Sequence, residues 1–314
     1  MHKYFNDTGL CIPEKHFMVD ISAKMAQILH MVERGEYFSL NRPRQFGKTT
    51  TAYLLWKNLQ QKDDYLTLEI SFEVSEDDTF DSKRNVAVYF AKLLKKAFLV
   101  LGEKSLASFV ENEMINLEGF ESLSNLITEI CTKVEKKVVI TIDEVDKASD
   151  NLLFMQFLAL MRDKYLAQNR GKDTSFHSVI LLGVHDIKNL KRKIRPEDAH
   201  ALNSPWNIAA DFTVDMSFHS EEIQSMLRQY TEETQIQMNI PAIAERIHYY
   251  TSGYPYLVSK MCKIVEEIII QERENKNWTL EDLEESFKYL VNPDYTTTLF
   301  DDLAKNLKKQ PGLV

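Results

Sequence analysis

Nine residues, RPRQFGKTT at 42–50, are of the types and spacing that bind the phosphates of a nucleotide. They end like the pattern G-x-x-x-x-G-K-[ST], in which backbone amides cradle phosphates, a lysine reaches the β- and γ-phosphates and a hydroxyl ligates Mg²⁺. Lys48 and Thr49 occupy the last two positions, and Gly47 lets the backbone approach a phosphate because it has no Cβ. The pattern begins with a glycine where this chain has Arg42, so a basic surface turn is the alternative.

The phosphate cradle is predicted to lie in the second part of this loop. Pro43 has no amide hydrogen, so the amides must come from the residues that follow it. The predicted phosphate-binding residues are Arg44, Gln45, Phe46, Gly47, Lys48, Thr49 and Thr50. Of these, Thr50 is placed to reach the α-phosphate.

Two acids end an apolar run, VVITIDEVD at 138–146. An aspartate at the carboxyl end of a buried strand can hold Mg²⁺ through its water shell, and Asp143 has that position. Glu144 follows it directly and can act as a general base on a water aimed at the γ-phosphate. A strand that merely stops in acidic surface residues is the alternative. Both motifs together, in this order, indicate a nucleotide site.

The elements predicted around the two motifs form an α/β fold. A short strand at 37–40 precedes the loop and a helix at 48–61 follows it, so the N-terminal amides and the positive dipole end of that helix face an anion. Further strands are predicted at 65–72, 137–146, 177–184 and 211–216, and helices at 21–35, 83–101, 104–113, 119–135 and 150–168. Alternating strands and helices predict a mostly parallel sheet covered on both faces.

Residues beyond 217 are predicted to be helical throughout. The helices are expected at 219–235, 240–251, 255–273, 279–291 and 296–309. Thr279 stands three residues before Asp282, which is the spacing of a helix-capping box. A separate helical domain is therefore expected after the sheet.

Composition and charge exclude several classes of protein. The 314 residues are 44% hydrophobic and 27% charged, as in globular proteins, and the net charge of −9 means that nucleic-acid binding would need a local basic patch. The three cysteines, Cys11, Cys131 and Cys262, are too far apart for a disulfide framework or a zinc site, and reduced thiols fit a cytoplasmic protein. No apolar run reaches the roughly 18 residues of a membrane helix, and MHKYFNDTG is no signal peptide.

The two motifs resemble those of the AAA-like ATPases of bacteria and archaea. These belong to the additional-strand-catalytic-glutamate branch of P-loop NTPases, near the archaeal ATPase and STAND groups. Their Walker A loop often reads RPR-x-x-GK[ST], which Arg42 fits, and ITIDEVD resembles their Walker B strand. LLGVHDIKNL at 181–190 resembles the sensor-1 strand, and TSGYPYLVSKMC at 251–262 resembles the start of a lid helix. The resemblance covers nearly the whole chain, including KYFNDTG and IPEKHFMVD near the N-terminus.

The resemblance implies a fold, a domain organisation and ligands. The fold is a parallel five-stranded sheet of order 5-1-4-3-2 flanked by helices, and the ligands are ATP and Mg²⁺. The domains are an N-terminal segment at 1–20, an ATPase core at 21–217 and a helical lid at 218–314. Lys48 and Glu144 are then catalytic, residues 44–50 bind ATP, and Thr49 and Asp143 ligate the metal. Gly253 and Pro255 would start a lid helix near the nucleotide, although Gly-Tyr-Pro also begins a helix for local reasons.

Candidates for sensing ATP follow the predicted strand at 177–184. His185 and Asp186 stand where the family has a polar sensor-1 residue, usually asparagine. KNLKRKIR at 188–195 has five basic residues in eight. Arg192 or Arg195 could reach the ATP of a neighbouring subunit in a homo-oligomer. The same segment could instead bind nucleic-acid phosphates or be a solvated loop.

The function implied is Mg²⁺-dependent ATP hydrolysis coupled to a conformational change. A weakly hydrolysing ATP-dependent switch or scaffold, with a protein or nucleic acid as partner, is the alternative. A small-molecule kinase is less favoured, because Glu144 follows the metal aspartate directly. The last residues, LKKQPGLV, end where a further domain would be expected to begin.

Overall fold

The computed structural model describes residues 2–73, 78–145, 151–183 and 205–292, which belong to two compact units. The sheet unit comprises Ala23–Arg44 and Thr51–Val214. The helical unit comprises Met1–Ser22, Gln45–Thr50 and Asp215–Val314. Six residues of the predicted phosphate loop therefore group, by their contacts, with the helical unit.

The described helices and strands follow the predicted order closely. In the first two hundred residues they are α1 (Ser22–Glu33), β1 (Phe38–Asn41), α2 (Lys48–Gln60), β2 (Tyr65–Ser71), α3 (Lys83–Val100), α4 (Lys104–Glu113), η1 (Met114–Asn116), α5 (Phe120–Lys133), β3 (Lys137–Asp143), α6 (Leu152–Asn169) and β4 (Ser178–Gly183). They continue with η5 (Pro205–Ile208), α8 (Ser220–Thr234), α9 (Ile240–Thr251), α10 (Pro255–Ile264), the π-turn η6 (Val265–Ile269) and α11 (Leu280–Val291).

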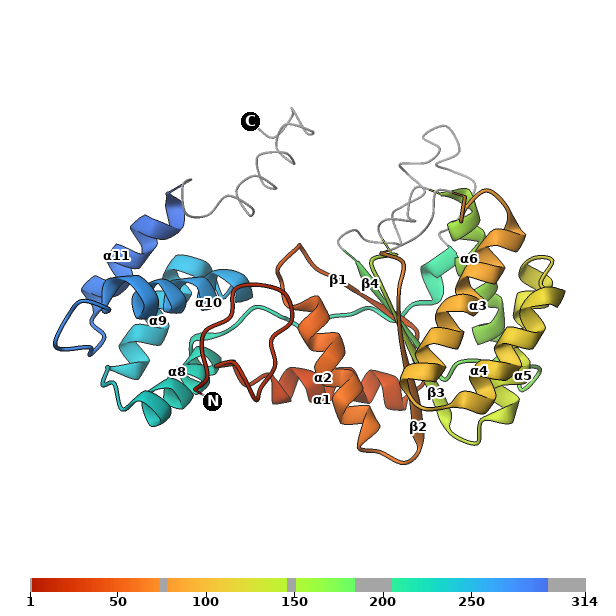
Figure 1. The fold of residues 1–314 in the computed structure, drawn as a ribbon, viewed down its shortest axis with the longest axis horizontal. Helices are drawn as coiled ribbons and strands as arrows, with labels where there is room; N and C mark the ends of the chain where they lie inside the picture. Colours follow the sequence, from red (N-terminus) through yellow and green to blue (C-terminus); the bar gives the residue numbers. More distant parts are fainter. Residues whose placement is uncertain (1, 74–77, 146–150, 184–204, 293–314) are drawn as a thin grey trace. The chain divides into compact units, whose positions relative to one another are not determined.

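A parallel sheet forms the centre of the sheet unit. Its described strands have the order β1-β4-β3-β2, and each neighbouring pair is parallel (Figure 1). All carboxyl ends therefore point to one edge, where β1 ends at Asn41 and β3 ends at Asp143. In open α/β sheets this edge is where ligands bind.

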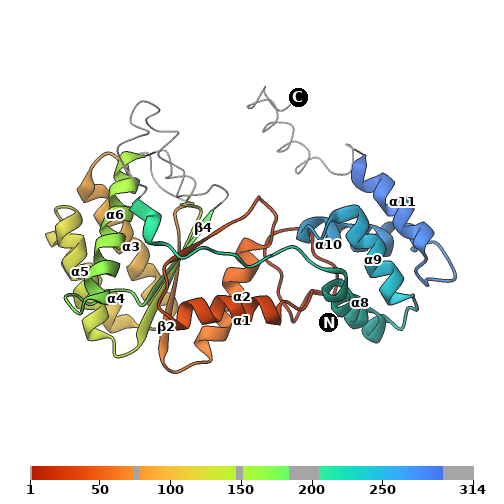
Figure 2. The same ribbon diagram turned by 180° about the vertical axis from the view of Figure 1, so that it is seen from behind.

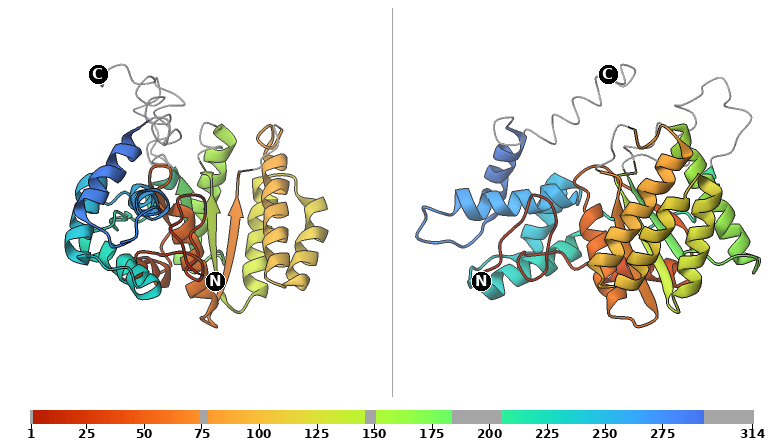
Figure 3. Two further views of the ribbon diagram at one scale, coloured as in Figure 1. Left: turned by 60° about the vertical axis from the view of Figure 1, so that its left-hand side comes forward. Right: turned by 45° about the vertical axis from the view of Figure 1, so that its right-hand side comes forward.

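Helices cover both faces of the sheet, as parallel sheets require. All six residues of β4 are buried, as are five of the seven in β3, so both faces must be covered. Helices α3, α4, α5 and α6 lie on one side of the strands, and α1 and α2 lie on the other (Figures 1 and 3). The prediction of an α/β fold with helices on both faces is confirmed.

The prediction of five strands is wrong for the described residues. The segment predicted as the fifth strand, 211–216, has no regular structure (Figure 2). Just before it, Ala210 makes an isolated parallel bridge with Phe38. The alternation of polar and apolar residues in DFTVDM does not produce a strand here, because β1 has only four residues to pair with. In addition, the Arg42 guanidinium donates to the Val214 carbonyl (2.7 Å), which fixes that backbone through a side chain.

The helical unit has a core of its own. Residues from α8, α9, α10 and α11 pack with Phe5, Phe17 and Val19 of the N-terminal segment. Phe5 and Phe17 are almost fully buried, which explains why the first 22 residues group with these helices.

Local sequence signals set where these helices begin. The predicted capping box is confirmed at α11, where the Thr279 amide donates to the Asp282 carboxylate (2.8 Å) and the Thr279 hydroxyl accepts from the Asp282 amide (3.4 Å). Pro255 is the first residue of α10, where its missing amide hydrogen costs no hydrogen bond.

Candidate nucleotide-binding site

The loop between β1 and α2 has the local structure that a phosphate site needs. It leaves the carboxyl end of the sheet after Asn41, and α2 begins at Lys48, the lysine of the GKT motif. Thr49 and Thr50 lie in the first turn of α2, so their amides are among those left without a partner inside the helix. Thr49 is exposed, whereas Lys48 and Thr50 are half-buried.

Two residues of this loop have left-handed backbone conformations. Gly47 has φ +77°, and a Cβ at that position would meet nothing within 4 Å. The backbone of Gly47 therefore borders open space, as a phosphate cradle requires. Gln45 has φ +59°, a conformation that residues with a side chain rarely adopt.

The acidic pair begins where β3 ends. Asp143 is the last residue of β3, and its Oδ1 accepts a hydrogen bond from the Glu144 amide (2.7 Å). Glu144 has φ +56°, so the chain turns sharply directly after the strand. Both side chains are half-buried. The roles of Asp143 as a metal ligand and of Glu144 as a base stay predictions.

Left-handed conformations thus coincide with both motifs. In the described ranges, four residues other than glycine have positive φ: Gln45, Glu144, Gln235 and Ser252. Gln235 and Ser252 are the C-caps of α8 and α9, where a left-handed residue is ordinary. The other two lie in the phosphate loop and in the acidic pair. Strained backbone of this kind clusters at functional sites.

Glu69 is a neighbour of Asp143 that the sequence did not reveal. In the β2–β3 register Glu69 lies opposite Thr141 and Ser71 lies opposite Asp143, so Glu69 and Asp143 share one face of adjacent strands. Burial, followed by the charge of Asp143, raises the pKa of Glu69 to about 7. Glu69 lies on the outer of the described strands and reaches solvent. Water therefore hydrates its carboxylate in part, which lessens the effect of burial on its pKa. Only the register, which the sequence does not specify, brings these carboxyl groups together.

Arg42 has a structural role that sequence reasoning also missed. Its guanidinium donates to the carbonyls of Asn41 (2.9 Å) and Val214 (2.7 Å) and lies 5.4 Å from the ring centre of Phe212. This arginine therefore connects the start of the loop to the segment after η5. Its place in the motif is explained by these contacts.

The predicted lid residues have clear structural reasons. Gly253 has φ +71°, and a Cβ there would lie 2.2 Å from the Phe218 carbonyl oxygen. The Phe218 amide donates to the Gly253 carbonyl (2.8 Å), so the two backbones are in direct contact. Pro255 then starts α10. These facts explain the Gly-x-Pro pattern without a nucleotide, so the lid role stays a prediction.

Four predicted residues lie outside the described ranges. These are the sensor and finger candidates His185, Asp186, Arg192 and Arg195, all within 184–204. Their roles stay predictions.

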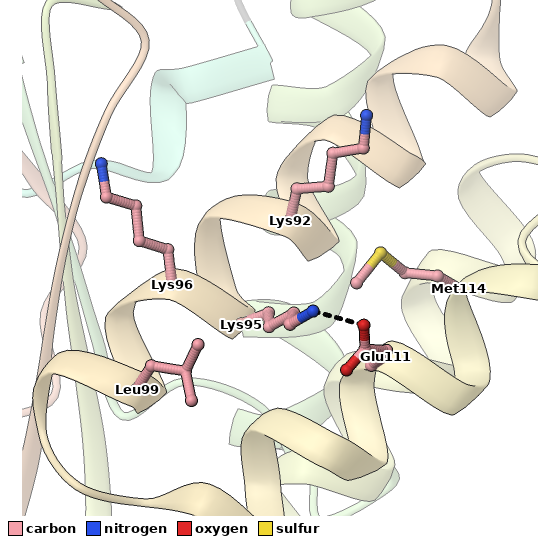
Figure 4. Close-up of a pocket in the computed structure, with 6 residues that line it drawn as sticks. All are labelled: Lys92, Lys95, Lys96, Leu99, Glu111 and Met114. Carbon is pink, nitrogen blue, oxygen red and sulfur yellow. Dashed lines mark hydrogen bonds and ion pairs between the residues drawn. The ribbon is translucent and has the colours of Figure 1, made fainter.

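A groove on the sheet unit is separate from the predicted site residues. It has a volume of about 530 Å³ and lies between α3 and the end of α4 (Figure 4). Three lysines of α3 and Leu99 line it with Glu111 and Met114, and Lys95 pairs with Glu111. Lys92 and Lys96 are exposed, as expected for the solvated face of a surface helix.

The residues of both motifs fit Mg²⁺ and a polyphosphate. The Asp143 carboxylate and the Thr49 hydroxyl are oxygen donors, which Mg²⁺ prefers. The Lys48 ammonium and the N-terminus of α2 supply positive charge at the loop.

Among the helices of the described ranges, none combines the length and the apolar character that crossing a bilayer requires.

A family model described as an AAA-like domain matches residues 13–284, which include the phosphate loop and the acidic pair. The chain belongs to the AAA-like family. The resemblance inferred from the two motifs is thereby confirmed over most of the chain. None of the curated proteins matches this AAA-like chain.

Several solved structures are similar to this AAA-like protein. The Walker-type ATPase PABY2304 of Pyrococcus abyssi is similar with a TM-score of 0.61 at 13% identity, over 98% of this chain and 80% of that one. A RuvB mutant of Thermotoga maritima has a TM-score of 0.49 at 13% identity, over 92% and 76% of the two chains. The ORC1 protein of Aeropyrum pernix, solved in complex with DNA, has a TM-score of 0.45 at 13% identity, over 87% and 66%. At 13% identity the likeness to PABY2304 shows the fold alone.

Proposed function

We propose that this AAA-like protein binds ATP with Mg²⁺ and hydrolyses it. The observation that most supports this is the coincidence of left-handed backbone with the two motifs. Among the described residues other than glycine, Gln45 and Glu144 are the two that have positive φ away from a helix end. They lie in loops that follow β1 and β3, whose carboxyl ends are at one edge of the sheet.

The loop residues would bind the phosphates. Amides of residues 44–48 and of the first turn of α2 donate to phosphate oxygens, and the Lys48 ammonium offsets their charge. Gly47 leaves room for this approach because no Cβ occupies the space beside it. Thr50 would reach the α-phosphate.

The acidic pair would divide the chemistry at the γ-phosphate. Bound Mg²⁺ supplies electrostatic stabilisation of the phosphate charge. Asp143 and Thr49 would hold that ion through oxygen atoms. Glu144 would accept a proton from the attacking water. The sharp turn after β3 would leave its carboxylate free of the metal site of Asp143.

The helical unit would act as a lid that responds to the nucleotide. We retain the division into a segment at 1–20, a core at 21–217 and a lid at 218–314 as part of this proposal. An arginine at 192 or 195 would complete the site of a neighbouring subunit if the protein forms a homo-oligomer. A cytoplasmic location is proposed with it.

Two substitutions test the proposal. Lys48→Ala should lower ATP affinity at least about tenfold, or about 1.4 kcal/mol, because the phosphate charge loses its partner.

Glu144→Gln should keep affinity and lower kcat by a factor on the order of 10² or more, because only the base is removed. Calorimetric titration and phosphate release measure the two effects. Turnover is followed at several protein concentrations, with and without duplex DNA.

Matched controls come from the same elements. Lys57→Ala removes a lysine from the last turn of α2, and Glu135→Gln removes an exposed glutamate just before β3. Both should behave as the unsubstituted protein. Unchanged ATP affinity in Lys48→Ala would refute the phosphate site. Tight binding with negligible turnover of the unsubstituted protein would instead favour the switch or scaffold.

A further inference from the structure

The N-terminal loop, residues 4–17, is closed on itself. The Tyr4 amide donates to the Lys15 carbonyl (3.2 Å), and the Phe17 amide donates to the Tyr4 carbonyl (3.1 Å). Inside the loop the buried Asn6 side chain donates to a backbone carbonyl two residues ahead (2.7 Å). These bonds make the loop a defined structural piece rather than a loose end.

Aromatic side chains fix this N-terminal loop to the helical unit. Phe5 packs against Tyr230 and Trp278, with ring centres 5.1 and 6.0 Å away. Phe17 packs against Tyr230 at 5.3 Å. All four side chains are buried in one core, so the two ends of the loop cannot move without disturbing that core.

Asp7 ties the middle of the N-terminal loop to α10. Its two carboxylate oxygens pair with Lys260 (2.8 Å) and Lys263 (2.7 Å), and only 7% of its side chain is exposed. Burial alone would raise the pKa of Asp7, but the two ammonium groups outweigh it and hold the pKa below its usual value. The carboxylate is therefore charged and doubly bound.

The tip of the N-terminal loop reaches the phosphate loop. The Cys11 amide donates to the Thr50 hydroxyl oxygen (3.2 Å). Because that oxygen accepts this bond, the hydroxyl hydrogen of Thr50 must point elsewhere. The contact thus restricts the orientation of a hydroxyl that is predicted to meet the α-phosphate.

A second contact holds the other end of the phosphate loop. The ring of Phe46 meets the ring of Tyr254 edge-on, with centres 4.9 Å apart and planes at 80°. Tyr254 is the residue directly before α10. Lys48 and Thr49 therefore lie between two anchored residues, and both anchors lead to α10: one through Tyr254 and one through Asp7.

We propose that the N-terminal loop and Tyr254 form a bracket that sets the conformation of residues 46–50, with Asp7 as its positioning residue. This rests on the proposed ATP site. Through the bracket, occupation of the phosphate loop and the arrangement of α10 influence each other. Such coupling is reciprocal, so weakening the anchor on α10 weakens nucleotide binding.

Asp7→Asn tests the bracket. The variant loses both ion pairs and should raise the Kd for ATP·Mg²⁺ at least about fivefold, the lower end of typical coupling between sites. Asp282→Asn is the matched control, since Asp282 is a carboxylate of the same unit with 4% exposure and an ion pair to Arg273 (2.9 Å). Both variants should lower the melting temperature, but Asp282→Asn should leave the Kd for ATP·Mg²⁺ within about twofold of the unsubstituted value. Titration calorimetry below the melting temperatures of both variants measures their Kd values for ATP·Mg²⁺.

Hydrogen exchange supplies an independent readout. In the unsubstituted protein ATP·Mg²⁺ should protect residues 4–17 and 251–262 together with 46–50, and in Asp7→Asn only 46–50 should stay protected. If Asp7→Asn does not fold, Lys263→Gln removes one of the two pairs and should show the same changes in smaller degree. Equal Kd in Asp7→Asn and the unsubstituted protein overturns the bracket and leaves the ATP site standing. No ATP binding by the unsubstituted protein overturns both.

Discussion

Gly253 shows how one residue can fix the path of the chain. Its φ of +71° and its contact with the Phe218 backbone exclude a side chain. Gly253→Ala should cost about 2–5 kcal/mol, from about 1–2 for left-handed strain and about 1–3 for overpacking. Denaturant unfolding of the helical unit measures this loss.

Gly9→Ala is the control for that substitution. Gly9 belongs to the same unit and has φ +59°, but a Cβ there would meet nothing within 4 Å. Its substitution should therefore cost only the backbone strain. Equal losses at the two positions would show that the Phe218 backbone yields easily and that the contact is not decisive.

Single residues also mark what the sequence could and could not predict. Lys48 at the start of α2 and Asp143 at the end of β3 were predictable, because the motif and the strand pattern fix them locally. Glu69 and Asp7 were not, because their partners are set by strand register and by tertiary packing. Their types and neighbours in sequence carry no signal of these roles.

A buried lysine joins two elements of the sheet unit, helices α5 and α6. Lys164 is 2% exposed, and its ammonium binds Asp173 (2.7 Å), the Thr128 hydroxyl (2.7 Å) and the Ser124 carbonyl (3.0 Å). Asp173→Asn leaves this buried charge without its counter-ion, so the free energy of unfolding should fall by about 3–5 kcal/mol. Urea unfolding tests this value.

The double variant distinguishes charge from packing at this contact. Lys164→Met with Asp173→Asn removes the buried ammonium as well as its partner. It should be more stable than Asp173→Asn alone, since Lys164→Met removes the uncompensated buried charge that the single variant leaves. A double variant that is less stable than the single one would mean that the hydrogen bonds to α5 outweigh the cost of burying the charge.

The missing fifth strand shows why element predictions fail. The pattern of 211–216 alternates as a strand should, but a strand needs a partner with free backbone groups. β1 is only four residues long and is followed by Arg42, whose side chain takes the Val214 carbonyl. β3 and β4, in contrast, are almost entirely buried apolar runs, which the sequence pattern does favour as central strands.

At the scale of the whole molecule, two separate cores must each be stable. One core joins β2, β3 and β4 with α3, α5 and α6, and the other joins the N-terminal segment with α8 to α11. Every residue of each core belongs to a single unit. The sequence predicted a change from alternating elements to helices near residue 217. It could not predict that the first 22 residues group with the helices, because that depends on where Phe5 and Phe17 pack.

Two cores predict two unfolding transitions. Leu94 and Leu283 are fully buried, one in each core, so Leu94→Ala and Leu283→Ala should each cost about 2–5 kcal/mol. In scanning calorimetry Leu94→Ala should lower only the transition of the sheet unit, and Leu283→Ala only that of the helical unit. ATP·Mg²⁺ should raise the transition that Leu283→Ala lowers, because residues 45–50 group with the helical unit. If both substitutions lower one common transition equally, the two units unfold together, and coupling between the phosphate loop and α10 would then extend to the whole chain.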